Sequence, residues 1–264
     1  MIACNFCDNR KFKLKYLYNQ KPKKETDFGI KKKNYKRCYI ECMNCNHYYS
    51  LMSFDINKLY SKKYSESTYG KKIYKTFKKI INLPNSQSDN FFRLKKFLKY
   101  FKSKNISFKK VIDIGSGTGV FPYSLLNKDI HITCLEPDTN LSKHLSNNLG
   151  LTVVKKDFFQ INFKKKYNVV TLNKVLEHVQ DPFKFMHKIY TILKKNGVVY
   201  IEVPDTISAS RHGKNREEFF VEHLHGFSNL SLKKLFDKTK FKLQMMKNIK
   251  EPSGKFTTYC FLTK

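Results

Sequence analysis

The stretch Val111-Ile112-Asp113-Ile114-Gly115-Ser116-Gly117-Thr118-Gly119 decides the fold of this 264-residue chain. Its first four residues have the apolar character of a short buried strand, and residues 120–126 after the glycines have the pattern of a helix start. Glycines allow a tight turn and let the backbone approach a ligand without interference from a Cβ atom. A strand, a glycine loop and a helix in this order predict the first unit of a nucleotide-binding α/β sheet.

A carboxylate follows the second predicted strand, residues 130–135. This residue, Glu136, lies 21 positions after Gly115. A carboxylate in this place can accept hydrogen bonds from both hydroxyls of an adenosine ribose. The loop reads GxGxG rather than GxGxxG, and the chain has no GxxxxGK motif. Both features argue against a dinucleotide and against a triphosphate held by a P-loop.

The alternation of strands and helices continues beyond this point. The further predicted strands are 151–154 before Asp157-Phe158, 167–172 before Asn173, and 198–203. A helix is expected over 181–195, because Asp181 suits an N-cap, Pro182 suits a first turn and Gly197 suits a helix end. Strands that alternate with helices in this way predict a parallel α/β sheet.

These segments, together with Leu172-Asn173-Lys174-Val175-Leu176-Glu177-His178-Val179-Gln180-Asp181-Pro182, resemble the class I S-adenosylmethionine-dependent methyltransferases. The resemblance covers about residues 105–264. It implies a Rossmann-like, seven-stranded methyltransferase sheet and S-adenosyl-L-methionine as the cofactor. For Glu177-His178, a packing or helix-capping role is favoured over a catalytic one.

The same resemblance implies which residues bind the cofactor. Those expected at its methionine end are Asp113, Gly115, Ser116, Gly117 and Gly119. Those expected elsewhere are Glu136 at the ribose hydroxyls, Asp157 at the adenine amino group, Phe158 beside the adenine ring, and Asn173, which would close the site.

The N-terminal region contains two CxxC pairs, Cys4 with Cys7 and Cys42 with Cys45. Two such pairs supply the four thiolates of a tetrahedral zinc site, and four thiolates leave no open position for a substrate, so a structural zinc is expected. Cys38 and His47 are nearby alternatives for one ligand, and a redox CxxC is the competing interpretation. The predicted organisation is a zinc-binding module at 1–60, connecting helices at 61–104, with a break at 83–89, and the methyltransferase domain at 105–264.

The segment 219–228 contains Glu222-His223-Leu224-His225 and resembles the "EH…FS" segment of methyltransferases from sugar and glycan pathways. Among these, the C-methylating deoxysugar enzymes also carry an N-terminal cysteine zinc module. The resemblance implies that His223 is the general base and Glu222 its neighbour, with His225 as the rival. The usual tyrosine two residues before the glutamate is Phe220 here, which removes a proton donor.

The charge is +31, with 52 Lys and Arg against 21 Asp and Glu. Such a charge suggests a polyanionic partner. However, 47 of the basic residues are lysine, whereas base and phosphate recognition relies on arginine. An AT-rich genome would also enrich lysine together with Asn, Ile, Tyr and Phe. No base-stacking motif of the Asn-Pro-Pro-Tyr type follows the fourth strand.

The expected function is therefore methylation of a small molecule, with a sugar or nucleotide-sugar in glycan biosynthesis as the favoured acceptor. The alternative is an RNA methyltransferase whose basic zinc module binds nucleic acid. Apolar runs are too short for a membrane span, and no secretory signal is apparent, so a cytoplasmic location is expected. The acceptor atom and the oligomeric state do not follow from the sequence.

Overall fold

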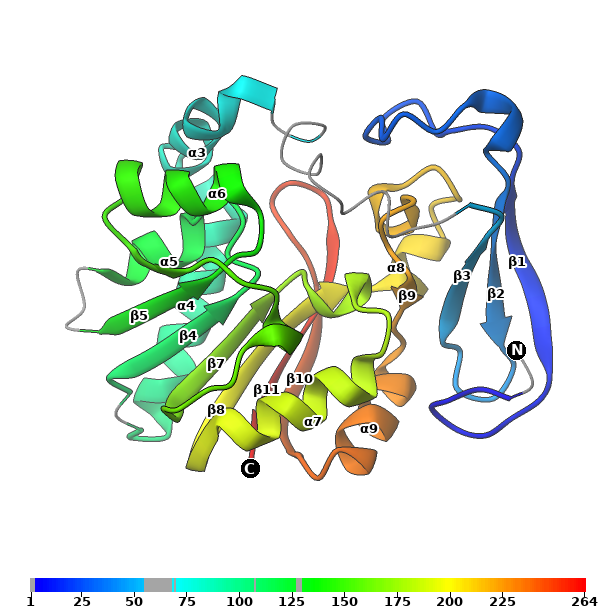
Figure 1. The fold of residues 1–264 in the computed structure, drawn as a ribbon. Coiled ribbons are helices and arrows are strands. Elements are labelled where there is room, and N and C mark those ends of the chain that lie inside the picture. The colour runs from blue at the N-terminus through cyan, green and yellow to red at the C-terminus, as the bar shows by residue number, and fades with distance from the viewer. Residues whose placement is uncertain (1–2, 55–67, 69, 107, 127–129) are drawn as a thin grey trace.

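The computed structural model describes residues 3–54, 68, 70–106, 108–126 and 130–264. Its strands form a seven-stranded sheet and a four-stranded sheet, which lie side by side (Figure 1). The strands of the larger sheet are β4 (Lys110–Ile114), β5 (His131–Leu135), β6 (Thr152–Val154), β7 (Tyr167–Asn173), β8 (Leu193–Pro204), β10 (Lys242–Lys250) and β11 (Phe256–Thr263).

The order of the larger sheet is β10-β11-β8-β7-β4-β5-β6. The five strands from β8 to β6 are parallel, whereas β11 is antiparallel to both β8 and β10. The chain goes from β4 outward to β5 and β6, and then returns to the other side of β4 with β7. The sheet therefore has a switch point between β4 and β7, where α/β proteins place their ligands. The predicted Rossmann-like seven-stranded sheet is confirmed.

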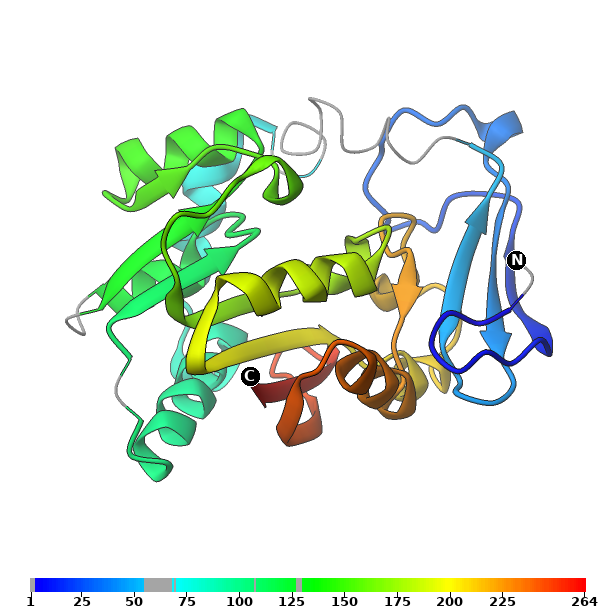
Figure 2. The same ribbon diagram turned by 60° about the horizontal axis from the view of Figure 1, so that its bottom comes forward.

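Helices cover both faces of this sheet (Figure 2). The helices are α3 (Ile73–Ile81), α4 (Asp89–Ser103), α5 (Val120–Leu125), α6 (Thr139–Lys143), α7 (Pro182–Ile192), α8 (Thr206–Ser210) and α9 (Asn229–Lys238). One face packs against α7 and α9, and the other packs against α3, α4 and α5. Successive residues of a strand pack in different cores, because their side chains point to opposite faces of the sheet. Ile112 packs in the core with α7 and α9, and Val111 packs in the core with α3, α4 and α5.

Two helices begin at side-chain caps, and the cap at Asp181 confirms the expected helix start. Ser88 accepts a hydrogen bond from the Phe91 N–H at the start of α4, and Asp181 accepts one from the Lys184 N–H at the start of α7. The end of α7 was predicted wrongly, because the helix stops at Ile192 and Leu193 already pairs with Tyr167 as part of β8. Asn196, which belongs to β8, has a left-handed φ of 61°.

The four-stranded sheet combines distant parts of the chain. Its strands are β1 (Phe12–Tyr18), β2 (Arg37–Cys42), β3 (Tyr48–Met52) and β9 (His225–Gly226), in that order and all antiparallel. Tyr49 pairs with His225, so a segment close to the C-terminus completes the N-terminal sheet. The division at residues 60 and 104 stays a prediction, and its positions 61–67 lie outside the described residues.

In the described part of the chain, no helix combines the length and the apolar character that crossing a membrane requires.

Candidate active site

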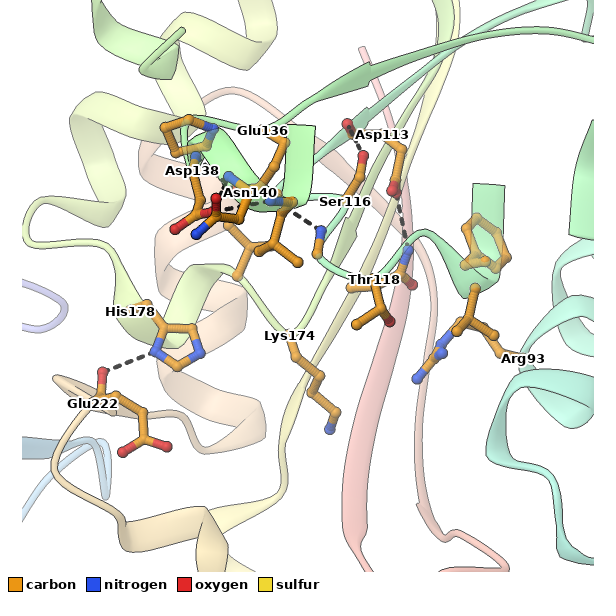
Figure 3. Close-up of a pocket in the computed structure, with 18 of the residues that line it drawn as sticks. Arg93, Asp113, Ser116, Thr118, Glu136, Asp138, Asn140, Lys174, His178 and Glu222 are labelled. Carbon is orange, nitrogen blue, oxygen red and sulfur yellow. Dashed lines mark hydrogen bonds between the residues drawn. The ribbon is translucent and has the colours of Figure 1, made fainter. Parts of the chain in front are cut away.

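A cavity of about 660 Å³ opens at the carboxyl ends of β4, β5 and β7 (Figure 3). The lining segments are 115–118 after β4, 136–141 after β5 and 173–175 after β7. Residues from elsewhere complete the lining: Arg93, Asp113, Val120, Phe121, His178, Glu222, His223 and Lys255. The cavity lies at the switch point of the sheet, as the fold predicts.

The loop after β4 needs glycine at two positions for steric reasons. Gly115 and Gly119 have φ values of 69° and 77°, in the left-handed region. A Cβ on Gly115 would lie 2.7 Å from a Val175 methyl carbon, and one on Gly119 would lie 2.4 Å from a Leu145 methyl carbon. Gly117 differs, because a Cβ there would meet nothing within 4 Å. Gly117 lines the cavity, whereas Gly119 is not among the lining residues and faces Leu145 and Leu149.

Asp113 forms the floor of the cavity at the end of β4. Its Oδ1 accepts hydrogen bonds from the Thr171 hydroxyl and, at 3.1 Å, from Asn173 Nδ2. The Ser116 hydroxyl donates to the Asp113 carbonyl at 3.0 Å. Burial raises the pKa of Asp113 to about 6, although these hydrogen bonds favour the carboxylate. Asp113, Ser116 and Asn173 are thus brought together, as the sequence suggested.

Glu136 directly follows β5 and is buried, with 6% of the residue exposed. Its Oε2 accepts from the Gly117 N–H at 2.9 Å, and its Oε1 accepts from the Asp138 N–H at 3.1 Å. Burial raises its pKa to about 7, and the nearby Asp138 and Asp113 add to this effect. A carboxylate has about four acceptor sites, so two remain for donors such as ribose hydroxyls.

Asp157 and Phe158 are placed apart from these residues and do not line the cavity. Asp157 accepts from the Phe159 N–H at 2.8 Å, and it caps the short helical turn Phe158–Gln160. Phe158 is buried against Phe185, with 4.6 Å between the ring centres. Both follow β6, the strand next to β5.

Two histidines from different loops meet at the other side of the cavity. The rings of His178 and His223 are 4.8 Å apart, centre to centre. His178 Nδ1 donates to the Glu222 carbonyl at 2.8 Å, and His223 Nδ1 donates to the Glu218 carbonyl at 3.0 Å. Burial lowers the pKa of both imidazoles, with that of His223 well below its usual value, so both are neutral near pH 7.

His225 lies outside the cavity lining. It is buried beside the N-terminal sheet, where its Nδ1 is 3.0 Å from His47 Nε2. Glu222, in contrast, lines the cavity together with His223. The structure therefore separates the two histidines that the sequence left as rivals.

Three lining cations were not singled out by the sequence analysis. Lys174 follows Asn173 directly, and its Nζ donates to the Thr257 hydroxyl at 2.7 Å. Burial lowers its pKa. Its position directly after Asn173, within the segment 172–182 that resembles the methyltransferases, was the sequence signal that could have identified it. Arg93 reaches the cavity from α4 and Lys255 from the β10–β11 hairpin, and nothing in their sequence neighbourhood connects them with the glycine loop.

The four cysteines of the two CxxC pairs converge in the N-terminal region. One sulfur atom from each lies within 4.8 Å of the others. The Cys4–Cys45 and Cys7–Cys42 sulfur distances are 3.5 and 3.6 Å. Zinc–sulfur bonds of about 2.3 Å give tetrahedron edges of about 3.8 Å, so the arrangement fits a Zn²⁺ ion.

The two alternative zinc ligands are not part of this cluster. Cys38 lies on β2 opposite Leu17 and Leu51, and it is half-buried. His47 is buried, and its two ring nitrogens face Ser231 and His225. Among the described residues, the donor set is therefore four sulfur atoms.

The chain is similar in sequence to curated enzymes over part of its length. It is 27% identical over 119 residues to the ubiquinone biosynthesis O-methyltransferase of Rickettsia bellii, covering 42% of this chain and 50% of the relative. It is 26% identical over 110 residues to the enzyme of the same name from Actinobacillus pleuropneumoniae, covering 38% and 47%. The chain thus matches about half the length of these relatives.

Solved structures share the fold. Magnesium protoporphyrin IX methyltransferase from Synechocystis superposes with a TM-score of 0.60 at 12% identity, covering 78% of this chain and 99% of that one. An S-adenosylmethionine-dependent methyltransferase from Clostridium acetobutylicum gives 0.55 at 12% identity, covering 73% and 98%. The model of the methyltransferase domain family matches residues 86–244, which is more than half of the chain. The chain therefore belongs to the methyltransferase domain family.

Proposed function

We propose that this enzyme methylates a small hydroxylated molecule, with a sugar-type acceptor of glycan biosynthesis as the first candidate. The observation that carries the proposal is one continuous cavity of about 660 Å³, which extends from the glycine loop to His178, Glu222 and His223. Small-molecule sites have volumes of about 300–1,000 Å³. A cavity of this size has room for a nucleoside-type cofactor and a small acceptor.

The cofactor side of the proposal rests on the residues around β4 and β5. Glu136 would accept from the ribose hydroxyls, while Asp113, Ser116 and the glycine loop would bind the methionine part. Asp157 and Phe158 are proposed beside the adenine, because they follow β6, which lies next to β5. The sulfonium methyl of S-adenosylmethionine is already activated, so the protein has to orient the acceptor and manage its proton.

The acceptor side of the proposal rests on His223 and its surroundings. A neutral imidazole whose Nδ1 proton is donated to a carbonyl has a lone pair on Nε2, and this pair can take a proton from a hydroxyl. Glu222 lines the cavity beside it and is proposed to orient the acceptor. The sequence relatives from Rickettsia bellii and Actinobacillus pleuropneumoniae are O-methyltransferases, which supports oxygen as the acceptor atom.

The choice of a sugar is supported by the similarity of residues 219–228 to the methyltransferases of sugar and glycan pathways. The zinc cluster proposed for the four cysteines is a second shared feature. It would tie the N-terminal loops together and leave no open position for a substrate.

The test is methyl transfer from labelled S-adenosylmethionine to fractionated cell extract. We expect label in small molecules that carry hydroxyl groups, with nucleotide-sugars tested individually. Total RNA is the matched alternative, and we expect only weak, salt-dependent binding to it, without transfer. Labelled RNA together with unlabelled small molecules would overturn the proposal in favour of RNA methylation.

A further inference from the structure

Glu177 is a buried carboxylate for which the described residues offer little compensation. It is 0% exposed, and neither side-chain oxygen has a hydrogen-bond partner in another described residue. The interactions that favour its charged form are the attraction of Lys174 and its own backbone amide. Lys174 Nζ itself donates to the Thr257 hydroxyl. An unsatisfied buried carboxylate is costly, so a cation bound beside Glu177 would stabilise it.

Two imidazoles lie next to this carboxylate. One ligand atom each from Glu177, His178 and His223 lies within 4.8 Å of the other two. Both histidines donate their Nδ1 proton to a backbone carbonyl, of Glu222 and Glu218 respectively, so Nε2 carries the lone pair of each neutral ring. Metal-binding histidines are typically oriented in this way, with the second ring nitrogen donating to a carbonyl or carboxylate.

We propose that Glu177, His178 and His223 bind a divalent transition-metal ion, such as Zn²⁺, Mn²⁺ or Co²⁺. Two imidazoles and one carboxylate form a donor set that suits these ions better than Mg²⁺ or Ca²⁺, which prefer oxygen ligands alone. The buried charge of Glu177 then has a counter-ion, and its orphaned oxygens have a bond partner. This site is separate from the four-cysteine cluster in both residues and ligand chemistry.

The position of the three residues gives the ion a role in the active site. His178 and His223 line the cofactor cavity, and Glu177 and His223 line a neighbouring cavity of about 130 Å³. Three protein ligands leave a position open for a substrate oxygen. The substrate class is therefore a molecule with a hydroxyl that can bind the ion beside the transferable methyl.

This role deepens the proposed function and rests on it. The proposed function gives proton removal to the Nε2 lone pair of His223. With the ion bound, this lone pair is used in coordination, so the ion takes over the activation of the hydroxyl and His223 acts as its ligand. The coordinated hydroxyl loses its proton to water, and the oxygen forms a bond to the methyl carbon as the carbon–sulfur bond of the cofactor breaks. Lys174 lines the same cavity, where its cation favours negative charge on that oxygen.

The binding site can be tested without measuring activity. Purified protein whose cysteine site is filled with Zn²⁺ is titrated with Co²⁺. We expect about one further equivalent, with d–d absorption but no sulfur-to-cobalt charge-transfer band, because its ligands are nitrogen and oxygen. Glu177→Gln and His178→Ala should each weaken Co²⁺ binding by at least about 10- to 100-fold, the loss that even outer-shell changes cause.

His187→Ala is the matched control, since His187 is an exposed histidine on α7 outside the cluster. Binding of S-adenosylhomocysteine, measured by calorimetry, should stay unchanged in Glu177→Gln and so report an intact fold. Equal Co²⁺ binding in wild type and Glu177→Gln, or no second equivalent in wild type, overturns the metal site. Failure of the wild type to bind S-adenosylhomocysteine contradicts the cofactor placement instead and leaves the metal result standing.

Discussion

Asn173 Nδ2 donates to Asp113 Oδ1 at 3.1 Å, which joins the carboxyl ends of β7 and β4 across the switch point of the sheet. The two residues are 60 positions apart in the chain. Asp113 is 2% exposed. Because Asp113 also accepts from Thr171, its carboxylate is fixed by the neighbouring strand. Hydrogen bonds between β4 and β7 therefore hold the floor of the cavity in place.

Removing the Glu136 carboxylate is expected to abolish cofactor binding and leave the fold intact. Glu136→Ala takes away the acceptor for the ribose hydroxyls and also the partner of the Gly117 N–H. Glu136→Gln keeps an acceptor oxygen and is expected to lose less affinity. Calorimetry with S-adenosylhomocysteine measures both, and an unchanged affinity in Glu136→Ala would contradict the assignment.

Cofactor affinity is expected to decrease as the pH falls from 8 to 6, because the pKa of Glu136 is about 7 without the ligand and the ribose needs the carboxylate. The stability of the ligand-free protein should change in the opposite direction. The pKa of Glu136 is higher in the folded protein than its unfolded value of 4.5, so protonation of Glu136 stabilises the fold fully at pH values below 4.5. This contribution, at most about 3 kcal/mol, is lost as the pH rises through 7.

The control for both pH effects is Glu136→Gln, which does not titrate. Asp113, with its pKa raised to about 6, contributes with the same sign, so the slope in stability should decrease in the variant without vanishing. Identical pH profiles for wild type and Glu136→Gln, in denaturant unfolding and in calorimetry, would exclude Glu136 as the titrating group.

Purified protein is expected to contain one equivalent of zinc in the cysteine cluster. Cys4→Ser and Cys42→Ser should each lose it, with loss of order in the loops that carry the CxxC pairs. Elemental analysis gives the metal content and proteolysis reports the order. Cys38→Ser is the matched control, since Cys38 lies outside the cluster. A zinc content equal to that of the wild type in both cluster variants, or no zinc in protein prepared without chelator, counts against the site.

His223→Ala is expected to lose turnover and keep cofactor affinity. Loss of a general base lowers rates by about 10²- to 10⁴-fold. Loss of a ligand to the proposed metal ion would lower turnover in the same direction, and Co²⁺ binding distinguishes the two roles of His223. His225→Ala should affect turnover much less, because His225 contacts His47 and does not line the cavity. Steady-state rates and calorimetry on both variants check this. A greater loss in His225→Ala, or equal turnover in the two, refutes the assignment, and near-normal rates in both indicate an acceptor that needs no base.

Gly119→Ala is expected to destabilise the protein more than Gly117→Ala does. Both residues have positive φ values, so each alanine carries a left-handed cost of about 1–2 kcal/mol. The added Cβ at residue 119 would also clash with Leu145, whereas at residue 117 it meets nothing within 4 Å. Denaturant unfolding compares the two, and Gly117→Ala should instead weaken cofactor binding, because Gly117 lines the cavity. Equal stabilities would contradict the steric argument.

The sequence by itself determined the sheet and its cofactor loop. The glycine loop, the carboxylate at Glu136 and the cap at Asp181 are local patterns, and their physical causes act within a few residues. In each CxxC pair the spacing that suits a shared metal ion is visible in the sequence, so the grouping of the four cysteines was predictable.

Only the tertiary structure decided which side chains complete the cavity. His223 lies in a turn, where its N–H donates to the Phe220 carbonyl, whereas His225 begins the strand that pairs with Tyr49. Two histidines that are close in the chain therefore lie in different places: His223 lines the cavity and His225 does not. Arg93 and Lys255 reach the site, and Glu177 meets His223, through packing of distant segments. Such contacts depend on the whole sheet, because the energy that fixes them comes from burial and not from local spacing.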